Sequence, residues 1–140
     1  TTLLYHDTER KEYIKELTRV LKSNGILSIV KHNNYGRIMQ KVIFENDLDA
    51  AFRILNGIEP TVKAFGKVNY YNPNDILTWS DNLKIEKISG IRTFFGLSPN
   101  NEIKYDESWQ EQILKLELLV SDIEEYKNIA FCTHIIYRKE

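Results

Sequence analysis

The chain has 140 residues, of which 42% are hydrophobic and 28% are charged. This length and composition are typical of one ordinary globular domain and exclude a disordered segment. The net charge of -1 at pH 7 creates no strong long-range field, so binding of a polyanion through bulk charge is not expected.

The first helix and strand are predicted from residues 8–30. A helix begins near Asp7 or Thr8, and Asn24 with the following glycine provides a left-handed stop. Its apolar positions recur at helical spacing: Ile14, Leu17 and Leu21. Residues 26–30 follow as a short, mainly β-branched run. Such a run predicts a strand covered on both faces, as in the centre of a parallel sheet.

Helices are predicted through the middle of the chain. Residues 36–44 and residues 47–55 both show helical patterns. Residues 61–71 are expected to be irregular. A further helix opens with Asn72 as its cap and Pro73 in its first position.

The last third of the chain contains two predicted strands separated by the longest helix. Residues 83–95 alternate around apolar positions and predict a strand that includes Arg92. A helix is expected over residues 108–123, and residues 129–137 predict a final strand. No repeat or linker interrupts this order, so we expect an α/β fold in a single domain over residues 1–140.

Polar side chains follow the first strand. His32 and Asn33 come at its carboxyl end, where ligands bind in open α/β sheets. A contact to a substrate or a cofactor is one interpretation of this pair. The alternative is a loop cap that forms hydrogen bonds with the neighbouring backbone.

Three later side chains are candidates for substrate binding. The guanidinium of Arg92 is suited to holding a carboxylate through two parallel hydrogen bonds, and the alternative is an ion pair at the sheet surface. Tyr70 and Tyr71 are suited to stacking on a base or on adenine, and the alternative is packing in the core or in a loop.

Histidine and cysteine provide no metal site in this sequence. The three histidines and the single cysteine, Cys132, show no metal-ligand spacing. Cys132 is predicted to be a buried small hydrophobe, and one cysteine excludes an internal disulfide and fits a reducing compartment. His134, in the middle of the last strand, is predicted to be a hydrogen-bonded core residue, with a catalytic role as the alternative.

Sequence motifs point to a family. The phrase Leu21-Lys22-Ser23-Asn24-Gly25, followed by an aliphatic strand, resembles class I S-adenosylmethionine-dependent methyltransferases. The segment Lys31-His32-Asn33-Asn34-Tyr35-Gly36 resembles the group that methylates 5-carboxymethoxyuridine in tRNA. Further matches to that group are Met39, Asn46, Pro73, Trp79, Gly90, Arg92, Phe94, Leu116-Glu117, His134 and Arg138-Lys139.

This resemblance implies a partial Rossmann-like sheet made of strands five to seven. The last two strands would be antiparallel, with the final strand between the other two and the helix at residues 108–123 as an insertion. It implies S-adenosylmethionine as the cofactor, contacted by His32, Asn33 and Tyr5. The residues implied in substrate binding are Arg92, Tyr70, Tyr71, Asn34 and Gly36.

The glycine loop expected in the donor site of this family is missing from the sequence. The chain has six glycines, none of them in a G-x-G arrangement. The resemblance therefore implies a truncated, C-terminal half of a methyltransferase, inactive by itself. The acceptor of the parent enzyme would be tRNA or a small molecule. No catalytic base is predicted, because methyl transfer is an in-line displacement that depends on alignment.

Two alternatives to an enzyme remain open. One is a non-catalytic fragment that forms a homodimer through an exposed sheet edge. The other is a small α/β binding module. No apolar run approaches the roughly 20 residues that span a bilayer, and residues 1–6 lack the form of a signal peptide. We expect a soluble cytoplasmic protein, and the missing initiator methionine predicts that the chain begins inside a longer one or after processing.

Overall fold

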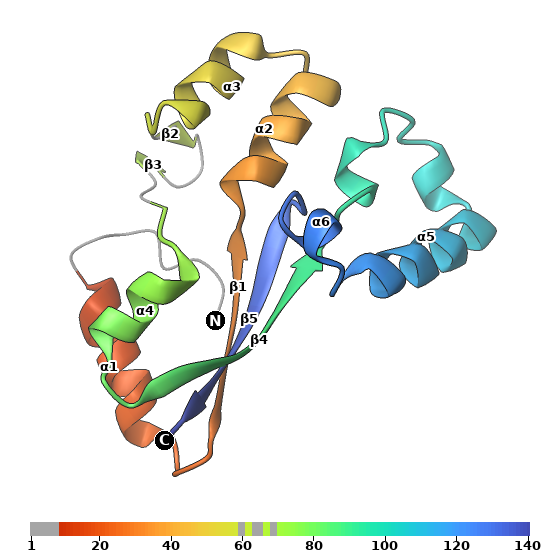
Figure 1. The fold of residues 1–140 in the computed structure, drawn as a ribbon. Coiled ribbons are helices and arrows are strands. Elements are labelled where there is room, and N and C mark those ends of the chain that lie inside the picture. The colour runs from red at the N-terminus through yellow and green to blue at the C-terminus, as the bar shows by residue number, and fades with distance from the viewer. Residues whose placement is uncertain (1–8, 59–60, 63–65, 68–69) are drawn as a thin grey trace. The chain divides into compact units, whose positions relative to one another are not determined.

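A computed structural model describes residues 9–58, 61–62, 66–67 and 70–140 of the chain (Figure 1). The chain divides into two compact units. Unit 1 contains Thr1–Lys31, Glu59–Ile88 and His134–Glu140, and unit 2 contains His32–Ile58 and Ser89–Thr133. Each unit has its own packing and is described by itself.

Among the described residues, the main sheet has three strands, in the order β1 (Ile26–His32), β5 (Cys132–Lys139) and β4 (Leu83–Ile91). Figure 1 shows that the arrow of β5 runs opposite to those of its two neighbours. The backbone hydrogen bonds agree, since Asn24 N–H donates to Lys139 O at 3.0 Å and Asn33 N–H donates to Phe131 O at 2.9 Å. The predicted antiparallel arrangement, with the last strand between the other two, is confirmed.

Strand β1 is buried on one side. Leu27, Ile29 and Lys31 are buried, whereas Ile26 and Ser28 are exposed. This alternation is typical of a strand beside an antiparallel neighbour. The prediction of a parallel strand covered on both faces was wrong, because aliphatic composition alone does not reveal which side chains face the core.

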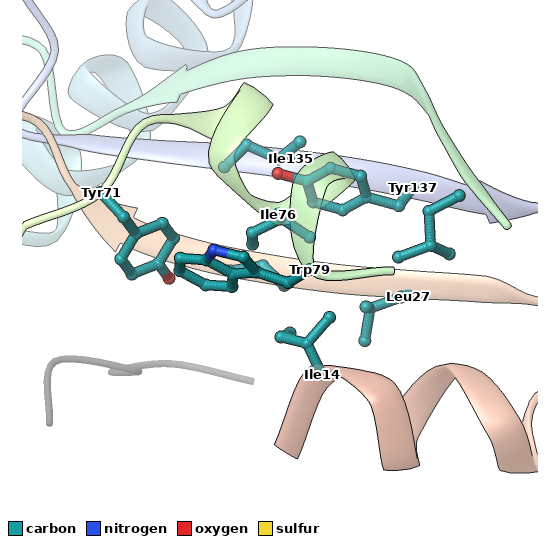
Figure 2. Close-up of a cluster of buried hydrophobic side chains, with 9 residues drawn as sticks. Ile14, Leu27, Tyr71, Ile76, Trp79, Ile135 and Tyr137 are labelled. Atoms are coloured by element: carbon teal, nitrogen blue, oxygen red, sulfur yellow. The ribbon is translucent and has the colours of Figure 1, made fainter. Parts of the chain in front are cut away.

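The hydrophobic core of unit 1 joins helix α1 (Arg10–Val20), helix α4 (Pro73–Trp79) and parts of the strands (Figure 2). The rings of Tyr71 and Trp79 lie beside each other in Figure 2, with centroids 5.4 Å apart. The buried members are Ile14, Leu27, Ile29, Tyr71, Ile76, Trp79, Leu83, Ile135 and Tyr137. The hydroxyl of Tyr137 donates to the carbonyl oxygen of Pro73 at 2.9 Å, which ties α4 to β5.

The helix-boundary signals of unit 1 act largely as predicted. Helix α4 begins at Pro73 after Asn72, whose backbone N–H donates to Asp75 Oδ2 at 2.7 Å. Helix α1 ends earlier than predicted, at Val20, with Leu21 in an extended conformation; Asn24 has the expected positive φ of 61°, but it lies in the turn before β1 and does not end the helix. The predicted caps of α1, Asp7 and Thr8, lie outside the described residues.

Residues predicted to be irregular contain a small two-stranded sheet. Strands β2 (Thr61–Val62) and β3 (Gly66–Lys67) pair in an antiparallel manner. Two residues per strand are too few to produce a visible alternation in the sequence.

Unit 2 begins with two helices that pack on each other, α2 (Asn34–Ile43) and α3 (Leu48–Leu55). Asp47 caps α3, since its side chain accepts the N–H of Ala50 at 3.0 Å. The chain returns from β4 through the 3-10 turns η1 (Phe95–Leu97) and η2 (Ile103–Tyr105). Helices α5 (Glu107–Val120) and α6 (Glu124–Lys127) then lead to β5.

Helix α5 exposes much of its apolar surface. Val120 is buried, but Leu114, Leu118 and Leu119 are 58%, 66% and 74% exposed. The helix is therefore held by part of its surface only, and the leucines on the rest face solvent. None of the helices in the described ranges combines the length and the apolar character that crossing a bilayer requires.

Candidate functional site

Four of the predicted site residues of unit 2 gather around Ala130 and Phe131, just before β5. The ring of His32 lies 5.0 Å from that of Phe131, and the Arg92 guanidinium carbon lies 4.8 Å from the same ring. The side chain of Asn33 donates to Ala130 O, and Gly36 lies against the same peptide. The structure thus brings together residues that are about sixty positions apart in sequence.

Asn33 has a capping role. Its side-chain oxygen accepts the N–H of Tyr35 at 3.4 Å at the start of α2. Its Nδ2 donates to the carbonyl oxygens of Asn128 at 2.8 Å and Ala130 at 2.9 Å. Both donors and the acceptor of this amide are therefore engaged with the backbone, which is the alternative that the sequence left open.

Gly36 and Asn34 belong to helix α2 and not to a loop. A Cβ atom at Gly36 would lie 2.1 Å from Ala130 O and 2.6 Å from the Cα of Phe131. Glycine at this position allows the helix to approach the backbone before β5, which is a packing role. Asn34 is the first residue of α2 and is half-buried.

Arg92 forms a turn at the end of β4. The strand ends at Ile91, and Arg92 has a positive φ of 60°, a conformation that L-residues adopt at a cost. The prediction that Arg92 lies within a strand was wrong. Its side chain is exposed and lies over two aromatic rings, with Cζ 4.8 Å from the centre of Phe131 and 5.8 Å from that of Phe95. Such contacts favour a cation over each ring.

A carboxylate holds the turn that follows Arg92. Glu117 Oε2 accepts the N–H of Thr93 at 2.7 Å, and its Oε1 accepts those of Phe94 at 2.8 Å and Phe95 at 2.9 Å. Sequence reasoning had identified Glu117 only as a family match. Because 22 to 24 residues separate Glu117 from these amides, no local pattern could have revealed the contact.

An apolar groove lies beside this turn. It has a volume of about 260 Å³. Ile91, Arg92, Phe95, Gln110, Ile113, Leu114 and Glu117 line it. The apolar side chains of the groove suit an apolar body, and the exposed Arg92 in its lining suits an anionic group, so a ligand with both would fit the groove.

Tyr70 and Tyr71 lie in unit 1 and pack with its core. Tyr71 is only 3% exposed, and Tyr70 is partly buried against the same cluster. The Arg10 guanidinium carbon lies 4.9 Å from the ring centre of Trp79, and Lys31 Nζ lies 5.5 Å from that of Tyr71. Burial raises the pKa of Tyr71 to about 12, against a smaller opposing effect of the Arg10 charge. Tyr5 lies outside the described residues.

The remaining histidine and the cysteine have structural surroundings. His134 Nε2 lies 2.8 Å from Ser28 Oγ on the neighbouring strand, so the imidazole is hydrogen-bonded as expected, but the residue is half-buried and does not belong to the core. Cys132 is buried, as predicted. Across the described ranges, no three histidine, cysteine, aspartate or glutamate side chains are placed to hold a metal ion.

Comparison of the sequence with protein-family models and with curated proteins found no match.

Proposed function

We propose that this chain is the C-terminal portion of a class I S-adenosylmethionine-dependent methyltransferase. One observation carries the proposal. The strand that comes last in the described chain, β5, lies between β1 and β4 and is antiparallel to both. In the methyltransferase fold, the seventh strand lies between the fifth and the sixth in the same way. The motif match at Leu21–Gly25 falls directly before β1, where the fifth strand would begin.

The described residues do not fit the methyl donor by themselves. Of its three proposed contacts, Asn33 is fully engaged with the backbone, and Tyr5 lies outside the described residues. His32 remains, half-buried against Phe131. One imidazole is too little to hold a nucleoside and an amino acid, so we expect no donor binding by these 140 residues.

The substrate side of the enzyme is the part that this chain would supply. Arg92 is exposed and lines the apolar groove, and a guanidinium forms paired hydrogen bonds with a carboxylate. A 5-carboxymethoxyuridine in tRNA combines a carboxylate with a base, which suits this combination. Arg92 would bind and orient the carboxylate. No side chain is needed to deprotonate such an acceptor, because the carboxylate is already ionised at neutral pH.

The coding sequence upstream of Thr1 is the first test. We expect a strand that ends in a G-x-G loop, followed by an acidic residue after the next strand. The protein translated from that extended sequence is then titrated with S-adenosylmethionine in a calorimeter, beside the 140-residue chain. We expect heat of binding for the longer protein only.

Two results would contradict this proposal. An upstream sequence without any glycine loop would mean that the longer protein lacks the donor site of this family. Micromolar binding of the donor by the 140-residue chain alone would show that the cofactor site is built differently from the one proposed here.

Self-association is a second candidate function, favoured by the exposed leucines of α5. We predicted a homodimer through an open sheet edge, and β1 has one hydrogen-bonded neighbour among the described strands. The leucine surface offers another route to the same outcome, because burying it would remove apolar area from water.

A further inference from the structure

We infer that Glu117 is the positioning residue of Arg92: through backbone amides it fixes the turn that presents the Arg92 guanidinium to an anionic ligand. The identity of that ligand as a carboxylate rests on the proposed function. The dependence of Arg92 on Glu117 does not, because it follows from the hydrogen bonds and from the backbone conformation.

The geometry of the turn is that of an anion-binding nest. Successive N–H groups of Thr93, Phe94 and Phe95 point at one carboxylate, at 2.7, 2.8 and 2.9 Å. Successive backbone amides in a turn form a concave donor site for a negative charge. Here that charge is supplied from within the protein, by Glu117 on α5.

The nest supports a strained residue. A positive φ is unfavourable for an arginine, and such residues persist where the surrounding structure over-determines them. Hydrogen bonds to an ionised acceptor are about twice as strong as neutral ones. Several such bonds, directly after Arg92, are therefore sufficient to hold the strained conformation.

The guanidinium of Arg92 depends on the same turn for its position. It lies over the ring of Phe95, whose amide Glu117 binds, and a Cβ at Gly96 would lie 3.5 Å from its Nη2. Within the described part of the chain, no hydrogen bond or ion pair joins this guanidinium to Glu117. Arg92 therefore lines the groove without an ion pair to Glu117, whose carboxylate binds the backbone amides instead.

The test uses NMR spectroscopy of the chain with Glu117→Gln and Glu117→Ala. Glutamine can keep its oxygen on the amides of Phe94 and Phe95, which leaves its NH₂ group facing Thr93. In Glu117→Gln we expect amide hydrogen exchange of Thr93 to accelerate by about tenfold, and that of Phe94 and Phe95 to change less. In Glu117→Ala all these amides should exchange faster.

The second readout is the Nε–Hε signal of Arg92. Because the Arg92 Cζ lies 4.8 Å from the ring centre of Phe131 and 5.8 Å from that of Phe95, we expect ring currents to shift this signal in the wild type. We expect both Glu117 variants to move it toward the position of free arginine. The matched control is Glu111→Gln, an exposed position on α5 with the same change of charge, which should leave the signal unchanged.

An unchanged Arg92 signal in Glu117→Gln, with Thr93 still protected, would overturn the inference. This variant keeps most of the hydrogen bonds, so it decides the question even where Glu117→Ala fails to fold. A shift of the signal in Glu111→Gln of equal size would also overturn it, because the effect would then come from the helix charge.

A binding measurement separates this inference from the proposed function. The probe is an anticodon stem-loop RNA that carries 5-carboxymethoxyuridine, compared with the same RNA carrying uridine. We expect Glu117→Gln to weaken binding of the first RNA by about tenfold and to leave the second unchanged. Equal binding of both RNAs by the wild type would contradict the proposed substrate, while the NMR readouts would still decide the role of Glu117.

Discussion

At Gly36, helix α2 lies directly against the backbone of Ala130 and Phe131. An alanine there would place Cβ 2.1 Å from the carbonyl oxygen of Ala130 and 2.5 Å from its carbonyl carbon. Backbone atoms before a strand cannot move aside as a flexible side chain can. We therefore expect Gly36→Ala to destabilise the protein by about 3 kcal/mol in urea unfolding, although alanine is the better helix former by about 1 kcal/mol.

Gly96→Ala is the control for this prediction. Gly96 is also buried, but a Cβ there would meet only Nη2 of Arg92, at an ordinary contact distance of 3.5 Å. Its cost should stay below about 1 kcal/mol. Equal stability of the two variants would show that α2 is free to move away from Ala130.

Tyr71 makes stability depend on pH in the alkaline range. Burial raises its folded-state pKa to about 12, above the ordinary value of 10.0 for the unfolded chain. The folded state therefore favours the neutral phenol. Its contribution is fully present below pH 10 and is lost as the pH rises toward 12. The free energy of unfolding, measured between pH 8 and pH 12, should fall less steeply in Tyr71→Phe.

Two other tyrosines bear on this experiment: Tyr137 is a second buried tyrosine, and Tyr105 provides an exposed control. Burial also raises the pKa of Tyr137, with further effects from Tyr71 and Asp75, so some alkaline loss should persist in Tyr71→Phe. Tyr105 is 85% exposed, and Tyr105→Phe should keep the wild-type pH dependence. A wild-type slope in Tyr71→Phe would place the alkaline sensitivity elsewhere.

Single residues were predictable where the signal was local. The caps Asn72 and Asp47 contact backbone or side-chain groups three residues away, and the left-handed turn at Asn24 is also local. Asn33 and Gly36 were recognised as special, but their partners lie about a hundred residues away. The sequence marks Asn33 and Gly36 as candidate site residues, but it does not show whether they contact a ligand or a distant part of the backbone.

At the scale of elements, the last strand stabilises the first helix. Lys139 Nζ donates to the carbonyl oxygens of Thr18 at 2.8 Å and Leu21 at 2.7 Å, which lie at the carboxyl end of α1. A cation is favourable there because the helix dipole is negative. We expect Lys139→Met to lower the free energy of unfolding by about 2 kcal/mol and to lower α1 protection from hydrogen exchange.

The matched control for Lys139 is Lys84→Met. Lys84 is exposed, and its ion pair with Glu140 spans 3.5 Å. Such surface pairs contribute little, so the loss should stay within about 0.5 kcal/mol. A loss at Lys139 no larger than this would mean that water caps α1 equally well.

Elements with strong periodicity were predicted to within a few residues, as α3 and α4 show. The end of β4 was missed because apolar residues continue through Phe94 while Arg92 already turns. That turn depends on Glu117, which arrives from α5. The apolar alternation in the sequence therefore extends beyond the end of β4 at Ile91.

At the scale of the whole molecule, the leucines of α5 predict self-association. Leu114 and Leu118 are one helical turn apart, and each is more than half exposed. Fully burying a leucine contributes roughly 1.5–3 kcal/mol, so a small cluster is enough to favour a dimer. We expect light scattering to show a mass that rises with concentration and returns toward the monomer in Leu118→Glu.

Gln112→Glu is the control, since it adds the same charge at an exposed polar position of α5. It should leave the association unchanged. A monomer at all concentrations in the wild type would contradict the second candidate function and would leave the leucine surface without a copy of this chain as its partner.

The order of strands in the sheet was predictable from the family resemblance. The periodicity of the sequence did not indicate it. Alternation in residues 129–137 indicates a strand but not its neighbours. The burial of β1 on one face followed from packing against α1 and α4, which composition did not reveal.

The position of β5 has a consequence for synthesis of the protein. Arg138 donates to the carbonyl oxygen of Asn24 at 2.7 Å across 114 residues of sequence, so β5 bridges to a strand that is made well before it. A ribosome adds about 5–20 residues each second, and the early strand must wait several seconds for its neighbour. During that wait, the edge of β1 that pairs with β5 is open to pairing with other strands. A nonsense codon before Cys132, where β5 begins, would leave that edge open permanently.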